Sequence, residues 1–281
     1  MGRRMVLSSN GDVEVMEERD GIGASNSNTG TLGKAVAVLE LVAMAERPMR
    51  FTDVFDRAGQ PRGTLHRQLS HLVEEGLLEL NADHCYEPGL RLLKLASRTW
   101  MRSDLRRFAA PHLQALHELT GETVHLGVLK GAEIIYLDKV ESRQAVRMDS
   151  QIGRASPAYC TGIGKAALAA LPEGMLGPLL DGVELRRFTP QTIADRPALE
   201  AELAAIRSAG HAFDREEHEA GIRCVAAAIV DAGHSLVGGI SVTGPAYRVG
   251  EDALADWAPQ VRRAAQSVAG ELAARLGPGG A

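Results

Sequence analysis

The stretch QPRGTLHRQLSHLVEEGLLEL, residues 60–80, decides the fold of the first part of the chain. Its leucines recur at helical spacing between Pro61, which suits the first turn of a helix, and Gly76, which suits the residue after one. We therefore predict a helix over residues 61–75. Two short apolar runs separated by a turn follow, and they indicate a β-hairpin over residues 77–87.

Two more helices are expected before this stretch. Apolar residues recur at helical spacing from Thr31 to Glu46, and a short helix is expected over residues 52–58. Helix, helix, turn, helix and hairpin form a winged helix-turn-helix, which we place at residues 31–90. Residues 1–30 end in GIGASNSNTG, which has neither periodicity nor a cluster of core-forming side chains, so we predict a disordered tail there.

The pattern changes twice after this domain. Residues 91–107 carry six basic side chains, one acidic side chain and several leucines, and they predict a single basic linker helix. Residues 108–277 mix helical and strand-like periods, with strands expected near residues 123–129, 133–140, 146–149, 224–230 and 236–242 and a closing helix from residue 251. The predicted fold class is therefore α+β, with a mixed α/β second domain.

The composition excludes several classes of protein. Of the 281 residues, 45% are apolar and 24% are charged, which is typical of globular domains and rules out a disordered, collagen-like or coiled-coil chain. No apolar run reaches the roughly 18 residues that a membrane helix needs, so we expect no membrane partner and a cytoplasmic protein. The three cysteines, an odd number without CxxC spacing, predict neither a disulfide framework nor a zinc site.

The helix predicted over residues 61–75 carries the candidate DNA contacts. A major groove about 12 Å wide admits one helix, whose facing side chains should be polar and not acidic. Arg62, Thr64, His66 and Arg67 meet that description, and we predict that they contact double-stranded DNA. The alternative is that they form the solvated face of an amphipathic helix. The basic linker helix offers further phosphate contacts, although charge on the outer face of a helix is also normal.

The run TGIGK, residues 161–165, opens a helix in the second domain. The first N–H groups of a helix have no partner within it, and that end attracts a carboxylate. The run is not a nucleotide-binding P-loop, because Ala166 follows the lysine and Tyr159 stands where that motif needs a glycine. The alternative is that the glycines serve close packing of the helix. Ser241 and Thr243 alternate on a predicted strand and so point to one face.

Three motifs together resemble the IclR family of bacterial transcriptional regulators. They are residues 60–80, SPAYCTGIGKAALAAL at residues 156–171, and DREEHEAGIRCVAAAI at residues 214–229. The stretch DKVESRQAVRMDSQIGR, residues 138–154, looks most like the branch that responds to 2-keto-3-deoxygluconate. The chain departs from the family pattern at Gly63, Cys160 and Ala228, so the resemblance specifies neither the operator sequence nor the effector.

The resemblance implies a GAF-like effector-binding domain and a set of residues that line its pocket. Backbone donors, an acceptor, a thiol and two hydroxyls would meet the effector, and two apolar side chains would form a wall. In that order the implied residues are Gly162, Ile163, Asp214, Cys224, Ser241, Thr243, Met148 and Ile222. Such a pocket suits a small carboxylate effector, such as a hydroxylated keto acid or sugar acid.

We therefore predict a ligand-responsive regulator, and specifically a repressor that the effector releases from its operator. Family members assemble symmetrically, so we expect a homodimer or homotetramer on a palindromic operator. An activator of the same family is an alternative that the sequence does not distinguish. An enzyme acting on a small keto acid would need a base beside Cys224, and no such signature surrounds that cysteine. We predict no catalytic residue, no cofactor and no metal.

Overall fold

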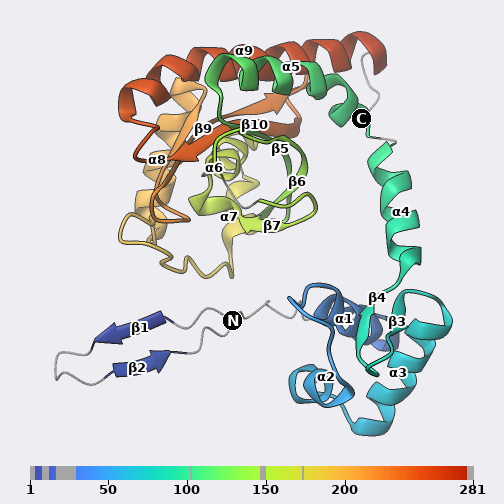
Figure 1. The fold of residues 1–281 in the computed structure, drawn as a ribbon. Helices are drawn as coiled ribbons and strands as arrows, with labels where there is room; N and C mark the ends of the chain where they lie inside the picture. Colours follow the sequence, from blue (N-terminus) through green and yellow to red (C-terminus); the bar gives the residue numbers. More distant parts are fainter. Residues whose placement is uncertain are drawn as a thin grey trace. The chain divides into compact units, whose positions relative to one another are not determined.

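The computed structural model describes residues 30–101, 103–145, 150–172 and 174–276, and the backbone of residues 4–7 and 13–16. The chain divides into two compact units, Met1–Arg98 and Thr99–Ala281 (Figure 1). Near its start, β1 (Arg4–Leu7) and β2 (Val13–Met16) pair as an antiparallel hairpin. This hairpin lies inside the segment for which the sequence predicts a disordered tail.

The first unit contains the three predicted helices and the second, predicted hairpin. They are α1 (Gly30–Ala43), α2 (Phe51–Ala58), α3 (Arg62–Glu74), β3 (Leu78–Leu80) and β4 (Tyr86–Pro88). Their common core consists of Val38, Val42, Met49, Val54, Leu65, Leu69, Leu72 and Leu78. Gly76 has a φ of +67°, a left-handed conformation that lets the chain reverse from α3 into β3. The prediction of a winged helix-turn-helix is confirmed.

The segment expected as a single linker helix is two helices. α4 (Leu90–Met101) and α5 (Asp104–Thr120) are separated at Ser103, whose hydroxyl accepts a backbone hydrogen bond at 3.3 Å and caps α5. A serine followed by an acidic residue is a signal for the start of a helix, and here it interrupts an apolar and basic pattern that continues across the break. Beside the break, Trp100 Nε1 donates to the carbonyl oxygen of Leu137 at 2.9 Å, which anchors Trp100 within the second unit.

The second unit is built on a six-stranded antiparallel sheet with the order β7-β6-β5-β10-β9-β8. The strands are β5 (Thr123–Lys130), β6 (Glu133–Val140), β7 (Ala155–Pro157), β8 (Ala212–Arg215), β9 (Ile222–Val230) and β10 (Leu236–Pro245). Asp214, Cys224 and Thr243 are direct partners across β8, β9 and β10, and Ser241 of β10 pairs with His125 of β5. Because paired residues project from the same face, this register gathers polar side chains from four strands. The sequence analysis predicted neither β7 nor β8, and the strand expected over residues 146–149 lies outside the described residues.

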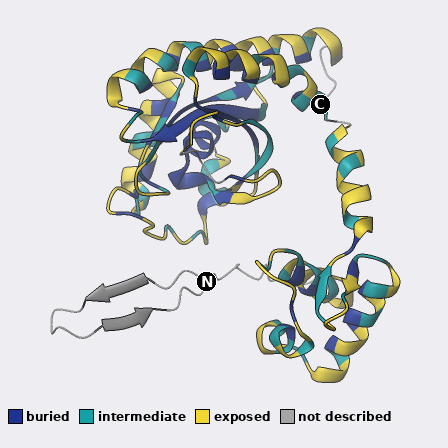
Figure 2. Ribbon diagram, in the orientation of Figure 1, coloured by how far each residue is buried: buried dark blue, intermediate teal, exposed yellow. Residues whose placement is uncertain are grey.

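Helices cover both faces of this sheet (Figure 1). α5 and α9 (Glu251–Leu276) pack on one face, and their core with the sheet includes Leu113 and Val261. The other face is covered by α6 (Gly162–Ala170), α7 (Leu176–Leu180) and α8 (Arg196–Ala209). The buried positions lie between these layers (Figure 2). Since almost all of α6 is buried, its N-terminus opens inside the protein, and this positions the site.

Candidate functional site

The four candidate DNA contacts lie on α3, one side of which is buried in the first unit. Leu65, Leu69 and Leu72 are buried there. Arg62, His66 and Arg67 are exposed, and Thr64 is half-buried. α3 is therefore an amphipathic helix that leaves polar side chains on the side away from its core.

Arg62 and His66 share a contact with Phe51 of α2. The Arg62 guanidinium lies 5.2 Å from the centroid of the Phe51 ring, and the His66 ring lies 6.0 Å from the same ring. Arg67 is exposed and makes no ion pair with any residue that the structure describes. α2 thus orients Arg62 and His66, whereas Arg67 projects into solvent.

The basic segment at residues 91–107 is partly neutralised within the protein. Three of its cations lie in ion pairs: Arg91 with Glu75 at 2.5 Å, Arg106 with Asp138 at 2.9 Å, and Arg107 with Asp104 at 2.8 Å. The guanidinium of Arg106 also lies 3.3 Å from the ring centroid of Trp100. Lys94 and Arg98 are exposed and form no ion pair within the described ranges. Fewer of these basic side chains are therefore available to contact DNA phosphates than their number in the sequence indicates.

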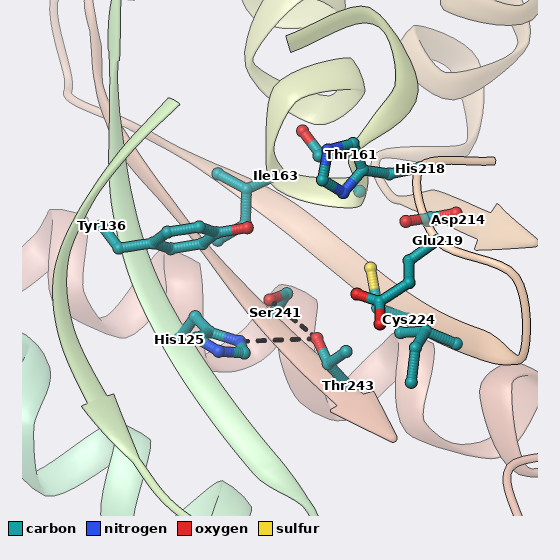
Figure 3. Close-up of a pocket in the computed structure, with 12 residues that line it drawn as sticks. His125, Tyr136, Thr161, Ile163, Asp214, His218, Glu219, Cys224, Ser241 and Thr243 are labelled. Atoms are coloured by element: carbon teal, nitrogen blue, oxygen red, sulfur yellow. Dashed lines mark hydrogen bonds between the residues drawn. The ribbon is translucent and has the colours of Figure 1, made fainter. Parts of the chain in front are cut away.

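A small cavity lies where the N-terminus of α6 meets the sheet (Figure 3). Seven of the eight effector candidates line it: Gly162, Ile163, Asp214, Ile222, Cys224, Ser241 and Thr243. The eighth, Met148, lies outside the described residues. The cavity has a volume of about 30 Å³, which is room for about two water molecules. The fold thus places residues of α6, β8, β9 and β10 around the same small cavity.

Five residues that are not among the predicted effector candidates also line the cavity. They are His125, Tyr136, Thr161, His218 and Glu219. The rings of His125 on β5 and Tyr136 on β6 lie 5.1 Å apart and form one wall (Figure 3). A histidine inside an otherwise apolar predicted strand was the available signal for His125, and Thr161 opens the TGIGK run, whereas Tyr136 carries no comparable signal.

Packing accounts for both glycines of the TGIGK run. A Cβ atom on Gly162 would lie 2.3 Å from the Cys224 sulfur, and one on Gly164 would lie 2.2 Å from the carbonyl oxygen of Ala158. Both glycines therefore let α6 approach its neighbours closely, as the alternative interpretation of this run proposes. Gly162 in addition lines the cavity, so the packing and binding interpretations are compatible at that position.

Asp214 is a buried carboxyl group in the cavity wall. The residue is 6% exposed, and its Oδ1 accepts a hydrogen bond from the Glu217 N–H at 2.8 Å. Burial raises the pKa of Asp214 to about 7, and the neighbouring Glu217 carboxylate acts in the same direction. Asp214 therefore exchanges its proton near neutral pH.

Lys165 lies next to the cavity, and its hydrogen bonds hold the elements around the cavity together. The residue is fully buried, and its Nζ donates to Glu217 Oε1 at 2.5 Å and to Glu202 Oε1 at 3.0 Å. Burial disfavours its charge, but the two carboxylates outweigh this effect and raise the pKa of Lys165. These bonds join α6 to α8 and to the loop after β8, which carries His218 and Glu219.

Ser241, Thr243 and His125 form a polar row along the sheet (Figure 3). The two hydroxyl oxygens lie 3.4 Å apart, Thr243 Oγ1 lies 3.5 Å from His125 Nδ1, and His125 Nε2 lies 2.7 Å from Ser150 Oγ. Burial and the nearby charge of Lys139 lower the pKa of His125 to about 4. The row is therefore neutral near pH 7, and its hydroxyls can both donate and accept hydrogen bonds.

The chemistry of Cys224 does not suit covalent catalysis. Burial and the neighbouring Asp214 raise the pKa of its thiol, whereas a nucleophile needs the thiolate. Among the described residues, no group of three His, Cys, Asp or Glu side chains is arranged to hold a metal ion. Within those same ranges, no helix has the length and apolar character needed to cross a membrane.

Two family models match this chain. Residues 98–270 match the model described as bacterial transcriptional regulator IclR C-terminal, and residues 31–82 match the IclR helix-turn-helix domain. Together they cover both structural units, so the resemblance that the motifs carry extends over most of the chain.

Individual relatives agree with these matches. XynR of Escherichia coli (strain K12), an HTH-type transcriptional regulator, is 34% identical over 232 residues, which are 82% of this chain and 92% of XynR. KdgR of the same strain, also an HTH-type transcriptional regulator, is 32% identical over 228 residues, which are 81% of this chain and 87% of KdgR. The two identities are nearly equal, so they do not select the KdgR branch.

A solved structure adds a relative with a ligand. It is an IclR homolog from Microbacterium hydrocarbonoxydans complexed with 4-hydroxybenzoate, and it is 27% identical to this chain. It superposes with a TM-score of 0.74 over 87% of this chain and 99% of its own. The matching family consists of transcriptional regulators, not of enzymes. This chain belongs to the IclR family of bacterial transcriptional regulators.

Proposed function

We propose that this protein is a repressor whose α3 binds operator DNA and which a small carboxylic acid releases by entering the cavity beside α6. The observation that best supports this proposal is the convergence of the seven described effector candidates on one small cavity. Because bacterial operator DNA lies in the cytoplasm, the proposal also implies a cytoplasmic protein.

The groups around the cavity favour an acid that also carries a hydroxyl. The N–H groups at the start of α6 and the hydroxyls of Ser241 and Thr243 suit a carboxylate, and Asp214 suits a ligand hydroxyl. A keto acid or sugar acid has these groups, and so does the 4-hydroxybenzoate bound by the relative from Microbacterium hydrocarbonoxydans.

The size of the cavity links binding to a change of conformation. Its volume of about 30 Å³ is far below the roughly 300–1,000 Å³ of typical ligand pockets. An effector therefore binds better to a form in which the cavity is wider. Such a difference in affinity between two forms is what a ligand needs in order to shift a repressor away from its DNA-binding form.

On the DNA side, we propose that Arg62, Thr64, His66 and Arg67 contact the operator through the major groove. Arg62 and His66 are held against Phe51, and Arg67 is free to extend. Preorganised side chains lose less conformational entropy on binding than mobile ones do.

We further propose a homodimer or homotetramer, supported by the exposed apolar side chains of α4. Leu90, Leu93, Leu95 and Met101 are between 54% and 75% exposed, and α4 buries none of its residues in the described chain. Leu90, Leu93 and Met101 share one side of the helix, and exposed apolar side chains grouped in this way are typical of association sites. A second copy of the chain would cover it and place two copies of α3 on a palindromic operator.

The test is fluorescence anisotropy with labelled DNA from upstream of the protein's own gene, at two salt concentrations. Pyruvate, 2-keto-3-deoxygluconate and 4-hydroxybenzoate are added in turn. We expect salt-sensitive, sequence-specific binding that at least one acid reverses. Asp214→Ala should keep wild-type DNA affinity and weaken the response to that acid by about 1–3 kcal/mol.

Each other outcome has a distinct meaning. Specific DNA binding that every acid leaves unchanged would refute the proposed effector class. Tighter DNA binding with an acid would indicate an activator or a co-repressed regulator. The absence of specific binding would refute the proposed operator.

A further inference from the structure

The walls of the cavity contain no cationic side chain among the residues that the structure describes. Its lining offers hydroxyls, a thiol, two imidazoles and the carboxyl groups of Asp214 and Glu219. Lys165 does not line the cavity, and its Nζ donates to Glu217 and Glu202. An ionised acid entering the cavity would therefore face carboxylates, with no cation among the described lining residues to offset them.

The charged and titratable groups around Asp214 come from several neighbouring elements. α6 contributes Lys165, α8 contributes Glu202, β5 contributes His125, β9 contributes Cys224, η1 (Ala158–Cys160) contributes Cys160, β6 contributes Tyr136, and the loop after β8 contributes Glu217, His218 and Glu219. Arg154 acts on His218 but does not line the cavity. The charge of Lys165 lowers the pKa of Asp214, but burial outweighs this effect, and Lys165 donates its hydrogen bonds to Glu217 and Glu202 instead.

We propose that the effector carboxylate enters this cavity together with one proton, which Asp214 carries and uses to donate a hydrogen bond to the effector. This inference rests on the function proposed above and adds the proton as an obligatory partner of the acid. Solvent supplies the proton, no covalent bond changes, and the complex gains one ligand and up to one proton. Asp214 would thus be neutral in the complex, and the cavity would hold a single negative charge from the effector beside the N–H groups of α6.

One general rule and two observations support this arrangement. Two ionised carboxylates held in one small buried cavity repel each other, and protonation of Asp214 removes this repulsion. Asp214 is 6% exposed and held by the Glu217 N–H, so it cannot turn away from a bound acid. Burial already raises its pKa to about 7 without a ligand, so the protonated form is available near neutral pH at little cost.

The test is isothermal titration of the full chain with pyruvate, 2-keto-3-deoxygluconate and 4-hydroxybenzoate, in pairs of buffers that differ in ionisation enthalpy, from pH 6 to pH 8.5. For each acid that binds, we expect the uptake of about half a proton at pH 7 and close to one at pH 8.5. The affinity should fall roughly tenfold between pH 7.5 and pH 8.5, because binding is linked to one proton. The neutral analogue 4-hydroxybenzamide should bind without proton uptake.

Two variants separate Asp214 from other groups. Asp214→Asn keeps a hydrogen-bond donor and cannot titrate, so acid binding should take up no proton and change less than twofold over the whole pH range. Asp231→Asn removes a carboxylate from the turn after β9, where an amide oxygen can still accept the same backbone bonds. This matched control should keep the proton uptake and pH dependence of the wild-type protein.

The possible failures are distinguishable. Acid binding by the wild-type protein without proton uptake would overturn this inference and leave the proposed function intact. Undiminished proton uptake by Asp214→Asn would assign the proton to another group and overturn it as well. If no acid binds either protein even at pH 6, the proposed effector class fails and this inference fails with it.

Discussion

Gly162 and Cys224 approach so closely that a Cβ atom on the glycine would lie 2.3 Å from the cysteine sulfur. Gly162→Ala should therefore force α6 away from β9 and destabilise the second unit by about 1–3 kcal/mol. Denaturant unfolding measures this change. Gly270→Ala is the matched control, because that helical glycine has open space around it, and it should stabilise α9 by about 0.5–1 kcal/mol. Equal effects of the two substitutions would contradict the packing role of Gly162.

The buried ammonium group of Lys165 holds together α6, α8 and the loop after β8. Lys165→Met should destabilise the fold by about 3–5 kcal/mol, because it leaves Glu217 buried without its ion-pair partner. The double variant Lys165→Met with Glu217→Leu should recover a large part of this loss in chemical denaturation. Arg196→Met, which breaks an exposed pair with Glu200, should cost less than about 1 kcal/mol. A Lys165→Met protein as stable as the wild type would refute the structural role of this ion pair.

The stability of the protein should depend on pH through Asp214. In the unfolded chain this carboxyl has its ordinary pKa of 3.8, whereas in the folded protein its pKa is about 7. A raised folded pKa means that the contribution to stability is present at low pH and is lost as the pH rises through about 7. Asp214→Asn should therefore gain stability relative to the wild type between about pH 4 and pH 7, by up to about 4 kcal/mol, with little further change above pH 8.

The wild-type protein and Asp214→Asn must be compared at each pH, because the titration of His125 changes the stability of both in the opposite direction. Its folded pKa of about 4 lies below the unfolded value of 6.5, so its contribution is lost as the pH falls through this range. The difference between Asp214→Asn and the wild type cancels this effect. A difference that stays constant from pH 4 to pH 8 would show that Asp214 is ionised throughout.

Arg67 should contribute directly to operator binding. Its side chain is exposed and makes no ion pair in the described chain, so Arg67→Ala should leave the fold intact. We expect a loss of operator affinity of about 1–3 kcal/mol if the guanidinium reads a base edge, measured by anisotropy. Arg263→Ala, on α9 of the second unit, is the control of equal charge and should leave DNA affinity unchanged. Unaltered affinity in Arg67→Ala would remove this residue from the DNA contacts.

The basic side chains between residues 91 and 107 should differ in their effect on DNA binding. Lys94 is exposed, whereas Arg106 is committed to Asp138 and to the Trp100 ring. If Lys94 neutralises a phosphate, Lys94→Ala should reduce the slope of log affinity against log salt by about 0.9. Arg106→Ala should leave that slope unchanged and lower the stability of the second unit instead. The reverse pattern would show that the ion pair of Arg106 opens when DNA binds.

The local elements of this fold could be predicted well because each has its own signal. Pro61 and Gly76 bracket α3, and the leucines between them recur at helical spacing, so the helix follows from neighbouring residues alone. The predictions of secondary structure failed where a local sequence signal is weak or competes with another signal. Ser103 starts a new helix inside an apolar and basic pattern that continues across it, and the four residues of β8 are too few for a clear period.

The sequence by itself determined that the chain has a winged helix-turn-helix, a second α/β domain and the motifs of a transcriptional regulator, because these features depend on residue type and short-range spacing. Only the tertiary structure decided which polar groups meet. Strand register pairs His125 with Ser241 and Asp214 with Cys224, and the packing of α6 directs Lys165 to Glu217 and Glu202, outside the cavity that its own motif opens. Burial and the proximity of charges set the protonation of Asp214 and the ion pairing of Arg106, and both depend on contacts between residues far apart in the chain.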